Sequence, residues 1–512
     1  MNCLKHYLLP ALLLVSYSCK QENKTKEPEQ DTTNMETAMY TEKFRPQFHF
    51  SPAEKWMNDP NGLVFHQGLY HLFYQYYPDD IVWGPMHWGH AVSKDLLHWE
   101  HKPIALYPDE LGYIFSGSAV VDTNNSSGLG SIENPPLVAI YTYHDPEKEN
   151  SGNNDHQTQG IAYSLDNGDT WTKYEGNPVI DNNEFLDFRD PKVFWDDDGN
   201  RWLMLLVAGD HLQIYSSENL IDWTYLSDFG KEQGAHGGVW ECPDMFPLQV
   251  EGSDEVKWVL LISINPGGPN GGSATQYFVG EFDGTTFTSD QQEEKWVDWG
   301  ADNYAGVTYN NVPDGERVFI GWMSNWNYAR NTPTEVWRSA MTLPRELSLH
   351  KINGEYELKN YPIEAFDTLA ESMEVEAGKA EYKTENFNAA DIKFTTGFST
   401  SEWRFYNEEG EELLIILDAD KKLLSIDRSR SGQTEFHESF ADQVHTTPIG
   451  NLPGSEFEVR IILDESSVEI FLNKGQYVMT EQLFPDNPYT RFSMKGTSVP
   501  GDVIINKVER VW

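Results

Sequence analysis

The sequence predicts an all-β protein, and three observations lead to that fold class. From Phe44 onward, short apolar and aromatic runs are broken by Gly, Asn, Asp and Pro, a pattern typical of strands joined by turns. Apolar stripes with the 3.6-residue period of a helix are rare, whereas apolar and polar residues often alternate. Aromatic residues, which favour strands, make up 13% of the chain.

A weak internal repeat favours a β-propeller for the first part of the body. Segments 93–99 (SKDLLHW) and 217–223 (SENLIDW) share their spacing, and segment 164–171 (SLDNGDTW) is one residue longer. Segment 282–287 (FDGTTF) resembles a degenerate fourth copy. The spacing of the copies fits four-stranded blades with variable loops. The alternative is a chance recurrence of Ser, Asp and Trp around hairpin turns.

The last part of the chain predicts a second β domain. Segments 459–463 (VRIIL) and 468–472 (VEIFL) alternate and precede a turn at 473–475, while 413–417 and 423–426 flank a turn at 418–422. Strands of this length with tight turns are typical of a β-sandwich. We therefore expect a catalytic propeller over residues 43–350 and a β-sandwich over 351–512.

The first residues predict export and anchoring. Lys5 precedes a short apolar run over 7–15, and Ser16, Tyr17 and Ser18 then lead to Cys19. This resembles the lipobox of bacterial lipoproteins, so residues 1–18 would be a signal peptide and Cys19 the lipidated residue. Residues 19–42 are polar and would form a disordered tether. We expect secretion across the inner membrane and a lipid anchor in the cell envelope, at the outer membrane; an ordinary cleaved signal is the alternative.

Composition narrows the partners. The chain carries 37 Lys and Arg against 81 Asp and Glu, a net charge of −44, which disfavours binding to nucleic acid. Of three cysteines, only Cys242 lies in the body, so we expect no disulfide framework and no cysteine metal site. The run at 196–200 (DDDGN) lacks the rest of a calcium loop and is typical of a hairpin turn. We expect neither a metal nor a cofactor.

Three acidic segments carry the chemistry: 56–62 (WMNDPNG), 188–192 (FRDPK) and 240–244 (WECPD). Each alone is typical of a turn, because Asn, Asp, Gly and Pro favour turn dihedrals. Together they indicate several carboxylates around one pocket. Glycosidic cleavage needs two carboxyl groups, one to attack or activate water and one to protonate the departing oxygen. The motifs of serine hydrolases, HExxH metalloproteases and phosphate-binding loops are missing from the sequence.

These segments, in this order, resemble the signature of glycoside hydrolase family 32, which includes invertases, inulinases and levanases. Segments 71–76, 83–90, 115–118, 321–326, 333–338, 343–347 and 464–471 also resemble family segments. The resemblance implies a five-bladed propeller packed against a β-sandwich, and retention of configuration through a covalent intermediate.

The resemblance also assigns roles to residues. Asp59 would be the nucleophile, Glu241 the acid/base, and Asp190 with Arg189 would bind sugar hydroxyls and stabilise the transition state. The fructose subsite would be lined by Asn58, Gln75, Trp83, Phe115, Ser116 and Trp322.

The leading functional interpretation is a hydrolase that releases fructose from levan, inulin or sucrose, acting from chain ends. A fructosyltransferase that uses the same intermediate is the second interpretation, and a non-catalytic surface propeller that binds fructan is the third. Linkage preference, exo or endo action, periplasmic or surface orientation and oligomeric state stay open at this stage.

The targeting segment leads to a first prediction. Cys19→Ala should shift the protein from the envelope membranes to the soluble fraction, because the acylated cysteine would be the anchor. Fractionation of cells and mass spectrometry of the N-terminus measure this. A native protein with an unmodified N-terminus elsewhere would rule out the lipoprotein assignment, and a chain starting near Thr41 should fold and stay active.

Overall fold

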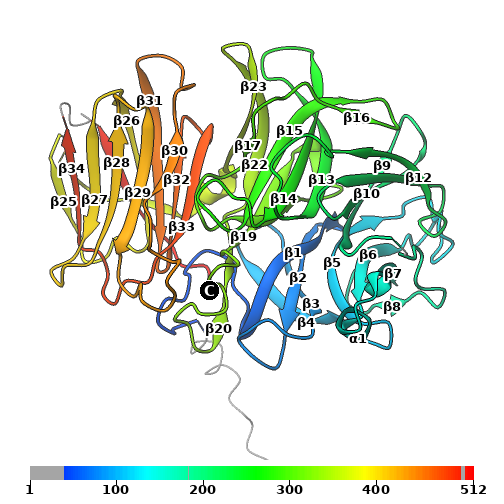
Figure 1. Cartoon of the computed structure of the whole chain (residues 1–512). Coiled ribbons are helices and arrows are strands. Elements are labelled where there is room, and N and C mark those ends of the chain that lie inside the picture. The colour runs from blue at the N-terminus through cyan, green and yellow to red at the C-terminus, as the bar shows by residue number, and fades with distance from the viewer. Residues whose placement is uncertain (1–39, 183, 377, 497–501) are drawn as a thin grey trace, which may run out of the picture. The chain divides into compact units, whose positions relative to one another are not determined.

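Strands account for nearly all the regular structure of the computed structural model, which describes residues 40–512 except 183, 377 and 497–501 (Figure 1). The all-β prediction is confirmed. The predicted signal peptide, Cys19 and the tether up to residue 39 lie outside the described residues. Tyr40 is buried and stacks on Trp512, with ring centroids 4.6 Å apart, so the described body includes the last residues of the predicted tether. In the part of the chain that is described, no helix has the length and apolar character needed to cross a membrane.

Between residues 55 and 362, the described strands form five sheets of four or five strands, built almost wholly from antiparallel pairs. The first sheet contains β1 (Lys55–His66), β2 (Leu69–Tyr77), β3 (His87–Ser93), β4 (Trp99–Leu106) and β20 (Trp337–Arg338). The second contains β5 (Tyr113–Val121), β6 (Leu137–His144), β7 (Gln157–Ser164) and β8 (Thr172–Lys173). The third contains β9 (Phe188–Asp196), β10 (Arg201–Ala208), β11 (Leu212–Ser217) and β12 (Thr224–Phe229).

The fourth and fifth sheets follow the same plan with short additional strands. The fourth contains β13 (Val239–Gln249), β14 (Val256–Asn265), β15 (Ala274–Phe282), β16 (Phe287–Thr288) and β17 (Lys295–Trp296). The fifth contains β18 (Tyr304–Thr308), β19 (Val318–Met323), β21 (Ala340–Met341), β22 (Arg345–Ile352) and β23 (Glu355–Pro362). This last sheet extends to Pro362, so the domain boundary expected at residue 350 falls inside β22.

The first strands of the five sheets form a ring. β1 contacts β5, β5 contacts β9, β9 contacts β13, β13 contacts β18, and β18 returns to β1. We call these five strands the ring strands. The second strands, such as β6 and β10, are buried along almost their whole length because neighbouring sheets cover both of their faces.

The four copies of the sequence repeat occupy equivalent places. Each lies where the third strand of a sheet turns into the fourth: β3 to β4, β7 to β8, β11 to β12 and β15 to β16. In the first copy, the backbone N–H of Leu96 donates to Ser93 Oγ at 2.9 Å, and that of His98 donates to Asp95 Oδ1 at 2.8 Å. The repeat is therefore a turn that short polar side chains close.

Residues 370–508 form two six-stranded sheets, which lie side by side to the left of the five smaller sheets in Figure 1. One contains β24 (Ala370–Ser372), β35 (Val503–Val508), β26 (Ala390–Gly397), β31 (Glu456–Asp464), β32 (Ser467–Leu472) and β33 (Tyr477–Gln482). The other contains β25 (Glu381–Lys383), β34 (Arg491–Gly496), β27 (Ser401–Tyr406), β28 (Glu412–Asp418), β29 (Leu423–Arg430) and β30 (His445–Pro448). Side chains of both sheets share one apolar core, which includes Ile392, Trp403 and Ile461.

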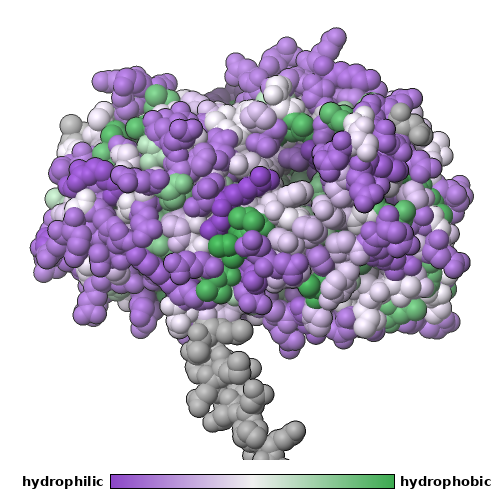
Figure 2. All heavy atoms as spheres, turned by 60° about the horizontal axis from the view of Figure 1, so that its bottom comes forward, coloured by the Kyte–Doolittle hydropathy of each residue, from purple (hydrophilic) through white to green (hydrophobic). Residues whose placement is uncertain are grey.

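Helical structure among the described residues is limited to short turns. These are the α-helix α1 (Pro146–Asn150) and the 3₁₀ turns η2 (Asn154–His156), η3 (Pro313–Gly315) and η4 (Glu364–Leu369). The face shown in Figure 2 is mostly hydrophilic, with hydrophobic residues in small separate groups, as a strongly charged soluble surface requires.

A buried cluster of charged side chains joins the first five sheets to the last two. Glu469 of β32 accepts hydrogen bonds from Arg345 of β22 at 2.9 Å and from the backbone N–H of Leu343 at 2.9 Å. His49 lies between Glu469 and Asp464, with ring nitrogens 3.0 and 2.7 Å from their carboxylate oxygens. Although burial opposes it, the two carboxylates raise the pKa of His49 to about 9. Because all of these groups are inaccessible to water, losing one partner leaves a charge uncompensated.

The second prediction concerns this histidine. Its folded pKa is raised from 6.5, so its contribution to stability is complete below pH 6.5 and is lost as the pH rises through about 9. One pKa unit corresponds to about 1.4 kcal/mol, so the loss should be on the order of 3 kcal/mol. Urea unfolding between pH 6 and 10 measures it. His49→Gln should flatten this dependence, whereas His98→Gln at an exposed position should not; a native chain equally stable at pH 6 and 10 would contradict the prediction.

Candidate active site

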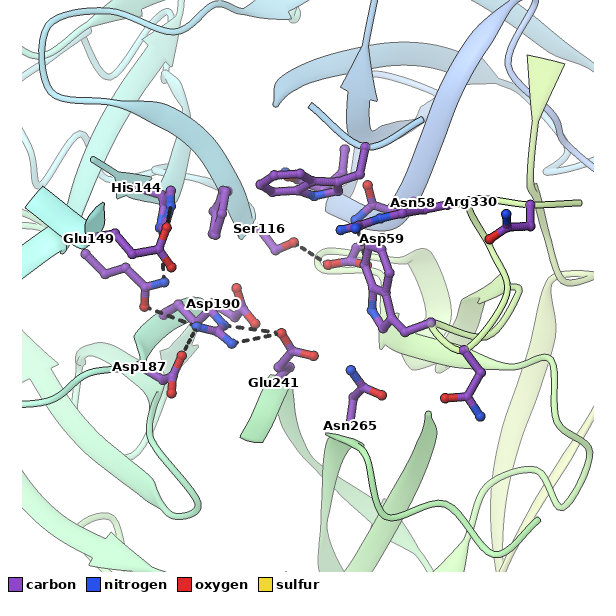
Figure 3. A pocket seen from close by; sticks show the side chains of 18 residues that line it. Asn58, Asp59, Ser116, His144, Glu149, Asp187, Asp190, Glu241, Asn265 and Arg330 are labelled. Atoms are coloured by element: carbon purple, nitrogen blue, oxygen red, sulfur yellow. Dashed lines mark hydrogen bonds and ion pairs between the residues drawn. The ribbon is translucent and has the colours of Figure 1, made fainter. Parts of the chain in front are cut away.

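A cavity of about 610 Å³ opens where the ring strands begin (Figure 3). All three predicted acidic residues line it, although they come from three different sheets: Asp59 from β1, Asp190 from β9 and Glu241 from β13. Its remaining lining is Asn58, Gln75, Trp83, Phe115, Ser116, His144, Glu149, Gln157, Asp187, Arg189, Asn265, Trp326, Asn327, Arg330 and Asn331. The arrangement therefore gathers carboxyl groups, amides and aromatic rings in one concave site.

Two neighbours orient the Asp59 carboxyl group. Ser116 Oγ of β5 donates to Asp59 Oδ2 at 2.7 Å, and Asn58 Nδ2 donates to Oδ1 at 3.0 Å. Burial raises the pKa of Asp59, and these hydrogen bonds oppose that rise. Both carboxyl oxygens are thus held in place, each by a different donor, as Figure 3 shows for Ser116.

Glu241 is held by a cation and a phenol. Arg189 of β9 donates to Glu241 Oε1 from Nε at 3.2 Å and from Nη2 at 3.1 Å, and the Tyr304 hydroxyl donates to Oε2. Burial raises the pKa of Glu241; Arg189 opposes the rise and the negative charge of Asp59 adds to it. A second carboxylate, Asp187, accepts from Arg189 Nη1 at 2.6 Å. Arg189 is therefore fixed between two acidic groups.

Asp190 lies deeper, beside Cys242. The Cys242 backbone N–H donates to Asp190 Oδ2 at 2.9 Å, and Cys242 Sγ lies 3.6 Å from the same oxygen and 3.7 Å from Asp59 Oδ2. Burial raises the pKa of Asp190 to about 7; Arg189 opposes the rise, while Glu241 and Asp59 add to it. The thiol thus lies between two carboxyl groups.

The sequence of each acidic segment is typical of a turn, but in the structure all three segments lie in strands. The physical reason is a local irregularity: every ring strand shifts its pairing register at the cavity. The shifts fall between Met57 and Pro60, Ile114 and Gly117, Arg189 and Lys192, Glu241 and Asp244, and Tyr304 and Val307. Such bulges accept proline and turn a side chain away from the usual alternation.

Five of the six residues expected to line a fructose subsite do line the cavity. Asn58, Gln75, Trp83, Phe115 and Ser116 all face it, and Trp83 meets the Phe115 ring edge-on at 6.1 Å. Trp322 does not: it is fully buried and packs against Trp326, whose ring centroid lies 4.9 Å away. Trp326 reaches the cavity instead, because Trp322 lies within β19 and Trp326 in the loop that follows.

Several lining residues carried no signal in the sequence. His144 ends β6 and Glu149 lies in α1, and the His144 ring stacks on Phe115 at 4.3 Å. Asn265, Asn327, Arg330 and Asn331 lie at a strand end or in the loop after β19. Only Asp187 lay close enough to the FRDPK segment to have been found. Across the described residues, no group of His, Cys, Asp and Glu could hold a metal ion.

Two family models match adjoining parts of the chain. Residues 49–362 match the glycosyl hydrolases family 32 N-terminal domain and residues 363–510 match the family 32 C terminal. A levanase of Bacillus subtilis (strain 168) is 45% identical over 500 residues, covering 93% of this chain and 72% of the relative. An extracellular exo-inulinase of Aspergillus awamori is 41% identical over 517 residues, which cover 92% of this chain and 96% of the relative.

Solved structures agree with these matches. The crystal structure of exo-inulinase from Aspergillus awamori superposes with a TM-score of 0.85 at 38% identity, covering 92% of this chain and all of that one. The fructofuranosidase from Schwanniomyces occidentalis complexed with fructose superposes with a TM-score of 0.80 at 32% identity, and the match covers 93% of this chain and 100% of that one.

The third prediction follows from the burial of Asp190. A carboxyl group whose folded pKa is raised from 3.8 to about 7 contributes stability below pH 3.8 that is lost as the pH rises through about 7. At pH 8 its charge is therefore a cost, and Asp190→Asn should stabilise the chain by on the order of 2 kcal/mol while impairing the site. The gain should vanish near pH 4.

Thermal unfolding at pH 4 and pH 8 measures this difference. Asp210→Asn, at an exposed position, serves as the control and should change stability little at either pH. An Asp190→Asn chain less stable than the native chain at pH 8 would contradict the prediction.

Proposed function

The chain belongs to glycosyl hydrolases family 32, and on that premise we propose how its acidic cavity performs the hydrolysis of a fructan β-fructosidase. The observation that carries the proposal is the convergence of Asp59, Asp190 and Glu241, from three sheets, on one buried cavity that Arg189 partly neutralises. Two carboxyl groups with opposed duties are what glycosidic cleavage requires.

In the first step, Asp59 attacks the anomeric carbon of the fructosyl unit. Ser116 and Asn58 hold its two oxygens, so the nucleophile needs no reorientation. Glu241 protonates the departing glycosidic oxygen. Burial and the charge of Asp59 favour the protonated form of Glu241, which this role needs. The products are a fructosyl ester on Asp59 and a released alcohol.

In the second step, Glu241 acts as base. Once Asp59 is esterified, its negative charge is gone, and the pKa of Glu241 falls because Arg189 remains beside it. Glu241 then takes a proton from water, which attacks the anomeric carbon and releases fructose. Two displacements at one carbon give retention of configuration.

Asp190 and Arg189 bind sugar hydroxyls and stabilise the charge that develops at the ring. Asn58, Gln75, Trp83, Phe115 and Ser116 shape the fructose subsite, with Trp326 in the place expected for Trp322. We assign levan or inulin as substrates, and sucrose in addition, because the levanase and exo-inulinase relatives align over most of this chain. Exo action fits a cavity whose base is closed by the ring strands.

The five smaller sheets are assigned as the blades of a propeller, with the five ring strands around its axis, and the two six-stranded sheets as a β-sandwich. The domain boundary is placed after Pro362, where the fifth sheet ends. For localisation, we propose secretion, supported by extracellular relatives, followed by anchoring of an acylated Cys19 in the envelope with residues 20–39 as tether.

The fourth prediction separates the two carboxyl roles. Asp59→Asn should lose at least ~10³-fold in activity on every substrate, because no other group forms the ester. Glu241→Gln should lose about 10²–10⁴-fold on levan, inulin and sucrose but keep fast ester formation on a fructoside with a good leaving group. A fructosyl adduct on Asp59 should then accumulate, and peptide mass mapping detects it. Glu149→Gln, also in the cavity, is the matched control and should form no adduct.

An adduct on another residue, or a first-formed fructose of inverted configuration, would contradict the assignment of Asp59. The early products distinguish the remaining alternatives. Single fructose units from levan or inulin support exo hydrolysis, early long oligosaccharides support endo action, and sugar products that grow in excess sucrose support a fructosyltransferase. Binding of fructan without any turnover would support a non-catalytic propeller.

A further inference from the structure

A second cavity, of about 600 Å³, lies at the opposite end of the ring strands. β9 lines the catalytic cavity with Asp190 near its start and this cavity with Trp195 near its end. β13 does the same with Glu241 and Phe246. A strand rises about 3.3 Å per residue, so the two cavities are ~17 Å apart along each strand. We call the second one the distal cavity.

The space between the two cavities is filled by a polar cluster. Lys192 Nζ of β9 donates to the carbonyl oxygen of Thr308 at 2.6 Å and lies 3.2 Å from Asp244 Oδ2 of β13. The backbone N–H of Thr308 donates to the same Asp244 oxygen at 2.6 Å. Both charged side chains are buried, so they close the axis, and the distal cavity is a separate site and not an extension of the catalytic one.

Aromatic rings and polar groups line the distal cavity together. Trp195 and Trp258 are only partly buried, and Trp195 is held by an edge-to-face contact with Trp202 at 4.9 Å. At the rim, the exposed side chains of Asn124 and Asp197 add amide and carboxylate groups. Partly exposed indoles held rigid beside polar groups are what the faces and hydroxyls of a sugar ring require.

Arg317 is a polar group of this cavity whose hydrogen-bonding capacity the fold leaves unused. Its guanidinium lines the cavity 4.7 Å from the Phe246 ring centroid, and its buried Nε has no hydrogen-bond partner among the described residues. Burial lowers the pKa of Arg317, and the charge of Asp244 opposes this. None of the guanidinium nitrogens forms a hydrogen bond with a described residue, so a ligand that brings an acceptor to those facing the cavity would be favoured there. The acidic run at 196–198 disfavours a polyanion, which leaves a neutral polyhydroxylated ligand.

We propose that the distal cavity is a non-catalytic binding site for a segment of fructan, with Trp195 stacking on a fructose ring and Arg317 donating to its hydroxyls. The choice of fructan as the sugar rests on the proposed function, whereas the assignment of the distal cavity as a sugar site rests on its lining residues. A polymer held there stays at a high effective concentration near the catalytic cavity of the same molecule, and of its neighbours on an envelope surface. Short substrates such as sucrose gain nothing from it.

Titration calorimetry with inulin-derived and levan-derived pentasaccharides tests the proposal. The Asp59→Asn chain, which should not turn the sugars over, is expected to bind two molecules. Adding Trp195→Ala or Arg317→Met should remove one site or weaken it at least ten-fold. Trp223→Ala is the matched control, since Trp223 flanks the same apolar cluster as Trp195 without lining the cavity, and it should keep both sites. A single site that both distal variants leave unchanged would overturn the proposal.

Kinetics on chains with intact Asp59 separate this proposal from the proposed function. Trp195→Ala and Arg317→Met should raise KM for levan at least three-fold and leave kcat/KM for sucrose within two-fold. An unchanged KM for levan would count against a fructan segment in the distal cavity. If the native chain cleaved neither sugar, the proposed function would fail, whereas the titration would still report whether the distal cavity binds them.

Discussion

The charge of Arg189 is the interaction on which the active site depends. Five carboxyl groups line one cavity in a chain whose net charge is −44, and the charge of Asp59 raises the pKa of both Asp190 and Glu241. Arg189 is hydrogen-bonded to Glu241 and Asp187 and precedes Asp190 directly, so a single guanidinium offsets much of this repulsion. Without it, the fold would have to keep the carboxyl groups protonated or admit water. Lysine could not replace it, because a single ammonium lacks the planar set of donors that reaches two carboxylates at once.

Bulges in the ring strands allow more side chains to face the cavity than regular strands would. In a regular strand, neighbouring side chains point to opposite faces, so a strand edge offers few groups to a cavity on the axis. A bulge in every ring strand breaks this alternation at one level of the molecule. Asp190 and Cys242 adopt φ values of 63° and 46° there, a costly conformation for residues other than glycine. Part of the backbone strain of the chain therefore lies where the chemistry takes place.

Local patterns made the all-β fold and the acidic triad predictable from the sequence. Strand alternation and turn residues act over a few positions, and the three short acidic segments, each typical of a turn by itself, together resemble the family signature. What could not be predicted depends on contacts between distant residues. His49 meets Asp464 and Glu469 only in the folded chain, and Glu149 reaches the cavity only because the fold places α1, in which it lies, beside the cavity. Trp322 lies inside β19 and Trp326 lies after the end of that strand, and the sequence alone does not reveal where the strand ends.

The short pairing between β20 and β1 has a consequence for the order of folding. Lys55 and Trp56 pair in parallel with Trp337 and Arg338, so the start of the strand that carries Asp59 lacks this neighbour until almost all five sheets have been synthesised. Until then β1 exposes an unpaired edge, the kind of edge on which strands of other chains assemble. A growing chain therefore gains from staying unfolded until residue 338 is available. Translocation of an unfolded chain would meet that need, and assembly would begin on the far side of the membrane with both ends of the ring present.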